Sequence, residues 1–442
     1  MSNDDHPVHG GQRAVTTPTR LFKIRLWLAG ELWVPVVAGN FLVIVLAFLL
    51  PELDESVART ERLPISASTT QAIFAAVAGS MITFTGIVFS AIFIAAQIQT
   101  SSYSPRLAAQ LRRDPIIMGA LVMSTSTATY ALFALAEVDR LTGSSSQEVP
   151  VLTVMFGLLL AVATLAWFAA LVQRAFENIQ IGGILRSLSK VAWRVVDDVH
   201  PAPDKNPSLP LPKIPEDAAV AEIEHRRGPG VLAAIDRRAL LKLANTTGGL
   251  VEVIPQVGEF ISGRSGVLRI HGGTRDPSQR QVNAVLVLSR QRTTQQDPLF
   301  VMRILVDIAI RAISPAINDP TTAVQVIDRV EALLVRLHER HPGPTYVVDS
   351  NGDPRALIHA PQWIEYFDLG STEIRRYGHR SMQIHRRLRA MHLHLLDVVA
   401  ASDRDRVQLE LDLLDEIAER EMDNSHDLRM AREPDRLGIG SI

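Results

Sequence analysis

A group of polar residues in the C-terminal half of the sequence is the best candidate for a binding site. One interpretation is structural: a capped helix–loop–helix corner whose charges pair among themselves. The functional interpretation is a ligand or ion pocket that gates the apolar part of the chain, or a contact between subunits. No pair of nucleophile and base can be assigned within it. The residues of this polar corner are Arg292, Gln296, Asp297, Asp307, Arg311, Ser314, Asn318, Asp319 and Pro320.

The motifs of common enzymes are absent from the sequence. The chain has no cysteine, which excludes disulfides, thiolate metal sites and cysteine nucleophiles. No glycine directly precedes a lysine, so there is no phosphate-binding P-loop. His338 and His341 are one residue too close to ligate a metal from one helical face, as the histidines of H-E-x-x-H do. We therefore expect no enzyme activity, no cofactor and no metal.

Four histidines fall on one predicted helix among several arginines. We interpret this segment as a solvated basic face. A metal site is the weaker alternative, because only two of the histidines, seven residues apart, clearly share a face. A surface that binds anions or lipid headgroups is the third. The histidines are His379, His385, His392 and His394.

Long uncharged segments define the elements that must carry these groups. Among 442 residues with a net charge of −2, four windows without Asp, Glu, Lys or Arg are long enough to cross a bilayer. The balanced charge argues against a nucleic-acid partner. The predicted four-helix transmembrane domain is 33–173, after a cytoplasmic segment 1–32. Its spans are Trp33–Leu50, Ala72–Ile98, Ile116–Ala136 and Val151–Val172.

Basic residues are unevenly distributed around these spans. They gather before the first span, between the second and third, and after the fourth, whereas the alternate loops carry few. By the positive-inside rule, both termini are expected in the cytoplasm of a bacterial cell, with the bilayer as a partner.

The second predicted span carries a stripe of small and hydroxyl residues. Such residues let another helix approach closely, so the stripe indicates tight packing, within the chain or in a homo-oligomer. The alternative is a hydroxyl-lined pathway for ions or small solutes, to which hydroxyls of the third span would add. No charged residue or histidine lies inside a span, which argues against proton relays. The stripe residues are Ala76, Gly79, Thr83, Gly86, Ser90 and Gln97.

The remainder of the chain predicts an α+β cytoplasmic domain. A connector over 174–230, rich in proline from about 198, precedes a β-rich part over 231–297. The spacing around Val257–Gly263 resembles the strand–turn unit of barrel-sandwich domains, and a generic small β-barrel explains it equally well. A mainly helical part follows over 298–425, where Asp319 before Pro320 predicts a helix start. The tail is 426–442.

Two stretches resemble the signatures of a known family. The stretches Gln97–Arg106 and Ile313–Ala323, with Arg292–Asp297 before the second, are similar to those of the bacterial domain-of-unknown-function family 2254. The resemblance covers roughly residues 20–425 and implies an integral inner-membrane protein, without an activity. Tyr103 stands where phenylalanine is commoner. The signature residues expected to couple the second span to the soluble domain are Gln99, Tyr103, Ser104, Pro105 and Arg106.

Two functions remain open from the sequence. The preferred hypothesis is a homo-oligomeric channel or transport protein with a regulatory cytoplasmic domain. The alternative is a membrane-anchored scaffold or sensor, whose cytoplasmic domain binds a partner or ligand while the spans anchor it.

Overall fold

A computed structural model describes residues 33–57, 66–102, 114–142, 151–201, 220–226 and 228–438. Contacts within the chain divide it into an N-terminal unit that ends at Ile184 and a C-terminal unit that begins at Leu185. The predicted segment 1–32 lies outside the described residues.

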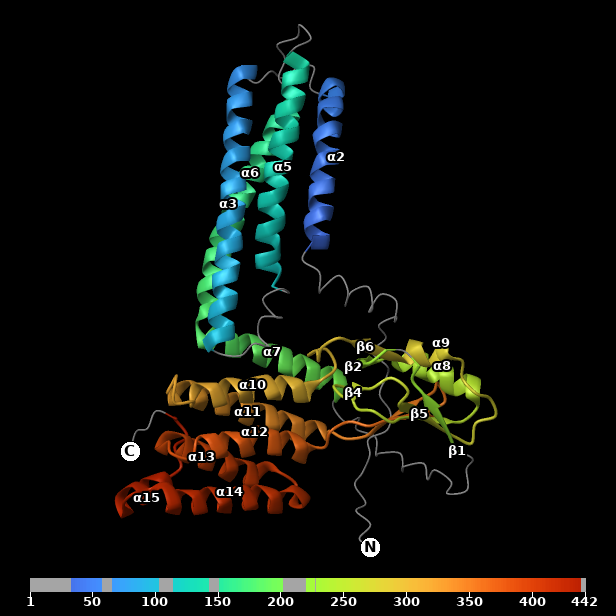
Figure 1. The fold of residues 1–442 in the computed structure, drawn as a ribbon, viewed down its shortest axis with the longest axis vertical. Coiled ribbons are helices and arrows are strands. Elements are labelled where there is room, and N and C mark those ends of the chain that lie inside the picture. Colours follow the sequence, from blue (N-terminus) through green and yellow to red (C-terminus); the bar gives the residue numbers. More distant parts are fainter. Residues whose placement is uncertain are drawn as a thin grey trace. The chain divides into compact units, whose positions relative to one another are not determined.

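The N-terminal unit is built from four long apolar helices (Figure 1). Each contains a segment long and apolar enough to cross a membrane, so all four predicted spans fall on helices that are candidate membrane spans. The candidate span of the second helix is 31 residues long, about 46 Å as a helix, so it exceeds a ~30 Å hydrocarbon core. The helices are α2 (Trp33–Val57), α3 (Ala67–Ser102), α5 (Pro115–Thr142) and α6 (Val151–Ile179).

Helix α5 packs against the other three helices and is the most buried of the four. Tyr130 of α5 is fully buried against Phe74 and Phe156, with edge-to-face ring contacts. Gly119 lets α6 approach, because a β-carbon there would lie 2.2 Å from the Trp167 ring. These contacts fix a close-packed bundle around α5.

The strands of the C-terminal unit form two open sheets rather than the predicted small β-barrel. The first has the order β1-β5-β3-β8-β7, antiparallel except between β3 and β8, and the second has the order β4-β2-β6. No closed barrel is present among the described strands. The sequence could not show this, because β7 and β8 come from the mainly helical part of the chain and complete the first sheet. The strands are β1 (Val220–Glu224), β2 (Gly230–Ile235), β3 (Leu250–Val253), β4 (Phe260–Ile261), β5 (Gly266–His271), β6 (Leu286–Ser289), β7 (Thr345–Val348) and β8 (Pro354–Ile358).

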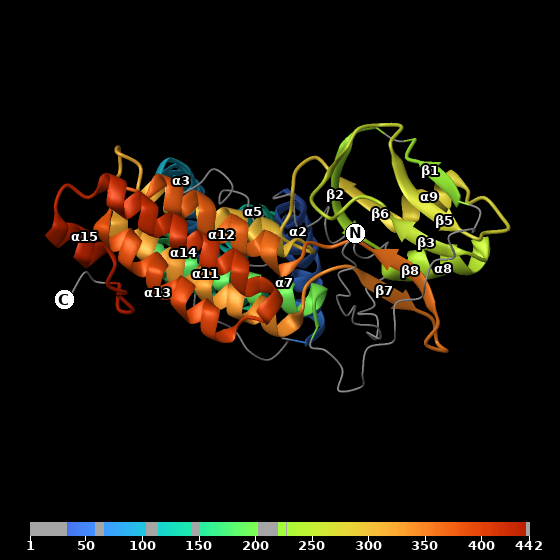
Figure 2. The same cartoon turned by 90° about the horizontal axis from the view of Figure 1, so that it is seen from below.

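Two short helices, α8 (Arg237–Thr247) and α9 (Gln279–Val285), close the core of this sheet region (Figure 2). Asp236 caps α8 by accepting a hydrogen bond from the Ala239 amide at 3.0 Å. Strand and helix residues share one apolar core that includes Leu240, Val251 and Val285.

The rest of the C-terminal unit is a stack of helices beside the sheets (Figures 1 and 2). Asp319 caps α11, as the sequence predicts, by accepting from the Thr322 amide. These helices are α7 (Ile181–Val199), which belongs to this unit from Leu185 onward, α10 (Pro298–Ala312), α11 (Pro320–Arg340), α12 (Trp363–Tyr377), α13 (Met382–Val398), α14 (Ala401–Glu421) and α15 (Ser425–Ala431).

The interpretation of α13 as a solvated basic face is wrong. His385 and His392 are 1% and 0% exposed, and Arg387 is buried against Asp328 and Glu331 of α11. The physical reason is that α13 packs against α11, α14 and α15, so its basic side chains bind carboxylates of neighbouring helices instead of water. The described residues contain no metal-binding cluster of His, Cys, Asp and Glu.

Candidate functional site

The structure separates the predicted polar corner into two groups at opposite ends of α10. Arg292, Gln296 and Asp297 precede the helix, and the remaining residues lie within it or after it. A helix of 15 residues is about 22 Å long, so the two groups cannot form one site.

The group after α10 is a turn between two helices. Ser314 donates to the Arg311 carbonyl at 2.6 Å, and the Asp319 amide donates to the Ala312 carbonyl at 2.7 Å. Asn318 adopts a left-handed backbone conformation with φ 51° before Pro320 begins α11. These bonds are those of a capped helix–loop–helix corner.

Asp307 lies in the middle of α10 and belongs to neither group. It accepts a hydrogen bond from Arg303, one turn earlier, at 2.6 Å. Arg303 also binds Glu373 of α12 in a two-bond arrangement, so this network joins α10 to α12.

The group before α10 is centred on an ion pair between the half-buried Arg292 and the buried Asp297. Arg292 binds Asp297 at 2.5 and 3.1 Å, and Asp297 also caps α10 by accepting from the Phe300 amide at 2.8 Å. Burial raises the pKa of Asp297, although its bonds with Arg292 oppose the shift. Gly258, with φ +96°, packs on the pair, and a β-carbon there would lie 2.5 Å from both side chains. The turn before β4 therefore needs glycine.

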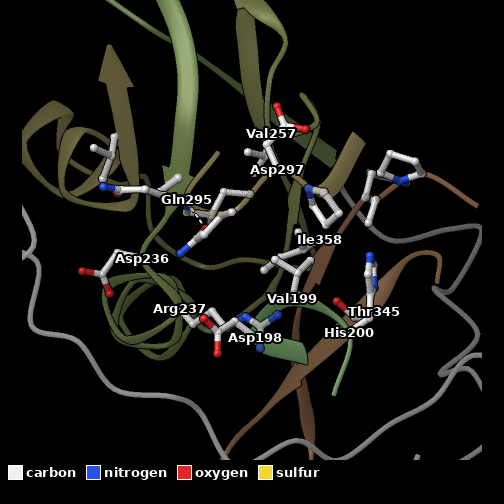
Figure 3. A pocket seen from close by; sticks show the side chains of 18 of the residues that line it. Asp198, Val199, His200, Asp236, Arg237, Val257, Gln295, Asp297, Thr345 and Ile358 are labelled. Carbon is white, nitrogen blue, oxygen red and sulfur yellow. Dashed lines mark hydrogen bonds between the residues drawn. The ribbon is translucent and has the colours of Figure 1, made fainter. Parts of the chain in front are cut away.

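Asp297 and Gln296 form part of the wall of a cavity of about 180 Å³. Figure 3 shows side chains converging on it from the end of α7, the start of α8, the strands and the segment before α10. All of these elements belong to the C-terminal unit. The polar and charged residues of the lining are Asp198, His200, Asp236, Arg237, Arg238, Gln295, Gln296, Asp297, Thr345, His359 and Tyr366.

His200 and Tyr366 form the most buried polar pair of this wall, at 2% and 0% exposure. Their Nε2 and hydroxyl atoms are 3.4 Å apart. Burial, with the nearby positive charge of Arg237, lowers the pKa of His200 to about 4. The imidazole is therefore neutral at pH 7, and the positive charge that acts on it comes from Arg237.

The carboxylates of the cavity wall differ in how available they are to interact with a ligand. Asp236 caps α8, and Asp297 caps α10 and binds Arg292. Asp198 is exposed at the end of α7. The helix amides offset part of the negative charge of the two caps, and Arg292 offsets that of Asp297 further.

Two glutamines add directed hydrogen-bonding groups. Gln296 accepts from the Ile235 amide at 3.0 Å, which ties the segment before α10 to β2. The buried Oε1 atom of Gln295 has no hydrogen-bond partner within the described part of the chain. An unsatisfied amide in a cavity wall is a position at which a ligand or a water molecule gains a hydrogen bond.

His359 joins the cavity wall to a second polar cluster between the strands. Glu252 lies 2.8 Å from His359, 2.9 Å from His271 and 3.1 Å from Arg269. Burial disfavours ionisation of Glu252, but the bonds from the two histidines and from Arg269 outweigh it and lower its pKa to about 2. The carboxylate therefore stays charged and holds His359 in place.

The small-residue stripe of α3 is exposed along its whole length in the single chain. A β-carbon added at Gly79 or Gly86 would meet no atom within 4 Å. The hydroxyls of Thr83 and Ser90 donate to carbonyls of their own helix at 3.2 and 2.9 Å. Ala76 and Gln97 are exposed as well, so the stripe does not pack against α2, α5 or α6.

The hydroxyls of α5 instead cross-link the bundle. Thr127 bonds Thr164 of α6 at 2.7 Å, and Thr129 donates to Asn40 of α2 at 2.5 Å. Asn40, which the sequence analysis did not single out, also donates to Thr125 at 3.1 Å. These groups satisfy one another inside the unit, as packing residues do.

The structure describes only part of the signature at the end of the second span. Gln99 lies within α3, and its side chain is not described. Tyr103, Ser104, Pro105 and Arg106 lie outside the described residues, so their predicted coupling role stays a prediction.

Sequence reasoning missed most of the cavity wall. His200, Arg237, Gln295, His359 and Tyr366 come from five separate segments. No spacing rule connects them, because the fold brings them together. The one local signal in the sequence is Asp297 before Pro298, which marks a helix start next to Gln296 and Arg292.

Four apolar helices followed by a mixed unit with two sheets and a helix stack define a multi-pass membrane protein with a large extramembrane part. Residues 29–393 match the family described as predicted membrane protein DUF2254, and the chain belongs to this family.

Its relatives include two mycobacterial proteins. The uncharacterized protein Rv1290c of Mycobacterium tuberculosis is 30% identical over 370 residues, which cover 80% of this chain and 69% of that protein. The uncharacterized protein Mb1321c of Mycobacterium bovis matches with the same identity and coverage. No solved structure matches the chain.

Proposed function

We propose that this protein is a membrane-anchored sensor whose C-terminal unit, on the cytoplasmic side, binds a small anionic ligand in the cavity between the sheets and the helix stack. The excess of basic residues in the loops on one side of the spans supports a protein of the bacterial inner membrane whose C-terminal unit lies in the cytoplasm. The described residues of the cavity wall include no serine, cysteine or lysine nucleophile, which supports binding rather than catalysis.

The charge and polarity of the wall support an anion. Arg237 contributes a partly buried cation, while His200 is neutral and both Asp236 and Asp297 are held in helix caps. The unsatisfied Gln295 Oε1 favours a ligand that also carries a hydrogen-bond donor. A hydroxy- or amino-carboxylate, or a small phosphate ester, has both groups.

Helix α7 supplies the physical connection to the membrane. Asp198, Val199 and His200 line the cavity at its end, and Gln180 is the only residue between its start and the end of α6. A ligand that shifts the end of α7 would act on the fourth span without another element between them. This continuity is the observation that favours a sensor over an isolated binding domain.

The first prediction concerns Arg237. Anions such as citrate, malate, inorganic phosphate and AMP are screened for raising the unfolding temperature of the purified full-length protein. An anion at 100 times its Kd stabilises the folded state by about 2.7 kcal/mol. We expect Arg237→Gln to weaken binding of the stabilising anion at least tenfold, since it removes the partly buried cation of the cavity wall.

The matched control is Arg280→Gln, on the exposed face of α9, which removes the same charge away from the cavity. It should leave the Kd unchanged. Equal weakening in both variants would indicate a diffuse charge effect and would contradict the proposed site.

A homo-oligomeric channel or transport protein is the second candidate, and the exposed stripe of α3 favours it. Small residues on an open helix face support close contact with a second copy, and any hydroxyl-lined pathway would then lie between copies. We expect Gly86→Leu to abolish both oligomer cross-linking and ion flux in sealed proteoliposomes. Gly182→Leu, also at an open exposed glycine, is the control. Unchanged assembly and unchanged flux in Gly86→Leu would exclude this role for the stripe.

A further inference from the structure

Helix α7 has two opposite faces. Residues of one face are buried in the C-terminal unit: Leu185, Leu188, Ala192, Val195 and Val196. The other face is exposed and basic. Its side chains are Arg186, Lys190, Trp193 and Arg194. Helical spacing places the basic residues opposite the buried ones, so this polarity belongs to the whole helix.

The outward face is held in a fixed orientation. Asp197 binds Arg336 at 2.7 Å and Arg340 at 3.0 Å, which clamps the end of α7 to α11. The Arg336 guanidinium also lies 4.6 Å from the centre of the Trp193 ring. One side of the indole is therefore supported by protein, while 44% of the residue stays exposed.

The three cations on this face have no carboxylate partner within the described part of the chain. The exposed large indole beside them is also unusual for a surface that faces only water. Basic side chains next to an exposed tryptophan are typical of helices that lie in the headgroup region of an anionic bilayer.

The position of α7 along the chain points to the same partner. The candidate span of α6 ends at Phe176, and α7 begins at Ile181. The start of α7 therefore lies within a few residues of the membrane boundary, whatever direction the helix then takes.

We propose that the face formed by Arg186, Lys190, Trp193 and Arg194 binds the anionic headgroups of the bilayer that α6 spans. The phosphates of the lipid headgroups pair with the three cations, and the indole inserts at the level of the ester groups. This contact is a property of the surface of α7 and does not depend on a ligand in the cavity.

The absence of native cysteine makes a depth measurement direct. A spin label is attached to Trp193→Cys in the full chain, which keeps the three cations and places the label about 20 Å along the helix from Gln180. The protein is reconstituted in vesicles of phosphatidylcholine alone, or with 30 mol% (about one third) phosphatidylglycerol. Collision rates with oxygen and with a polar nickel chelate then report depth. Asp405→Cys, exposed on α14, is the aqueous reference.

In the anionic vesicles we expect the label at 193 to favour oxygen over the nickel chelate several-fold more than the label at 405. The triple substitution R186Q/K190Q/R194Q should abolish this difference in reagent preference between the labels at 193 and 405. The matched triple R404Q/R420Q/R429Q, which removes exposed arginines from α14 and α15, should not. A label at 193 that is equally accessible to the chelate in both lipids overturns the proposal. So does a label shielded from both reagents in both lipids, which would indicate a protein contact on this face.

Discussion

Acidification from pH 7 to pH 4 is expected to lower the free energy of unfolding of the C-terminal unit by roughly 6 kcal/mol through two buried histidines. Burial lowers the pKa of His200 to about 4, helped by Arg237, and burial lowers that of His392 to about 4 as well. In the unfolded chain both have a pKa near 6.5. Below that value the unfolded state binds more protons, so stability falls as the pH drops from about 6.5 to about 4.

The slope of the free energy of unfolding against pH identifies the groups that cause the loss of stability. Each histidine contributes at most about 1.4 kcal/mol per pH unit in that window. Urea unfolding is followed by a fluorophore on Asp405→Cys, so that the report comes from the C-terminal unit. His392→Gln should remove about half of the slope, whereas His426→Gln, exposed on α15, should leave it unchanged. A slope unaltered in His392→Gln would show that other groups control the acid sensitivity.

Replacement of Glu410 by alanine is expected to destabilise the C-terminal unit by about 3–5 kcal/mol. Glu410 of α14 is 1% exposed and binds Arg375 of α12 at 2.7 Å and Thr372 at 3.1 Å. Its loss leaves the buried Arg375 guanidinium without this carboxylate, which is costly in a low-dielectric interior. Because α12 also carries Tyr366 of the cavity wall, the same change should weaken ligand binding.

A double substitution separates the buried charge from a general loss of packing. Glu410→Met with Arg375→Met removes both charges, and we expect it to recover more than half of the lost stability. Glu419→Ala breaks an exposed pair with Arg432 and should cost less than about 1 kcal/mol. A Glu410→Ala variant with unfolding like that of Glu419→Ala would contradict the importance of the buried pair.

The membrane part was predictable because its signal is local. Uncharged segments such as the predicted span Trp33–Leu50 coincide with helices, since a bilayer span must satisfy its backbone within the segment. The cap at Asp319 was readable for the same reason. The sequence did not show that the α3 stripe faces outward, because small residues are compatible with contacts inside the chain and between copies.

The C-terminal unit was harder to predict because its contacts join distant segments. The parallel pairing of Val251 with Ala356 turns an expected barrel into an open sheet, and no sequence pattern indicates that partner. The basic residues of α13 looked solvated because their carboxylates, Asp328 and Glu331, lie on another helix. The cavity wall depends on the same long-range contacts.

The most direct measurement for a ligand-binding C-terminal unit is a calorimetric titration of the full-length protein with the anion that stabilises it most. We expect one site per chain, lost in Val257→Phe, in which a larger side chain fills the cavity beside β2, and weakened at least tenfold in Arg237→Gln. Binding that survives both substitutions would place the anion elsewhere and would contradict the proposed sensor site.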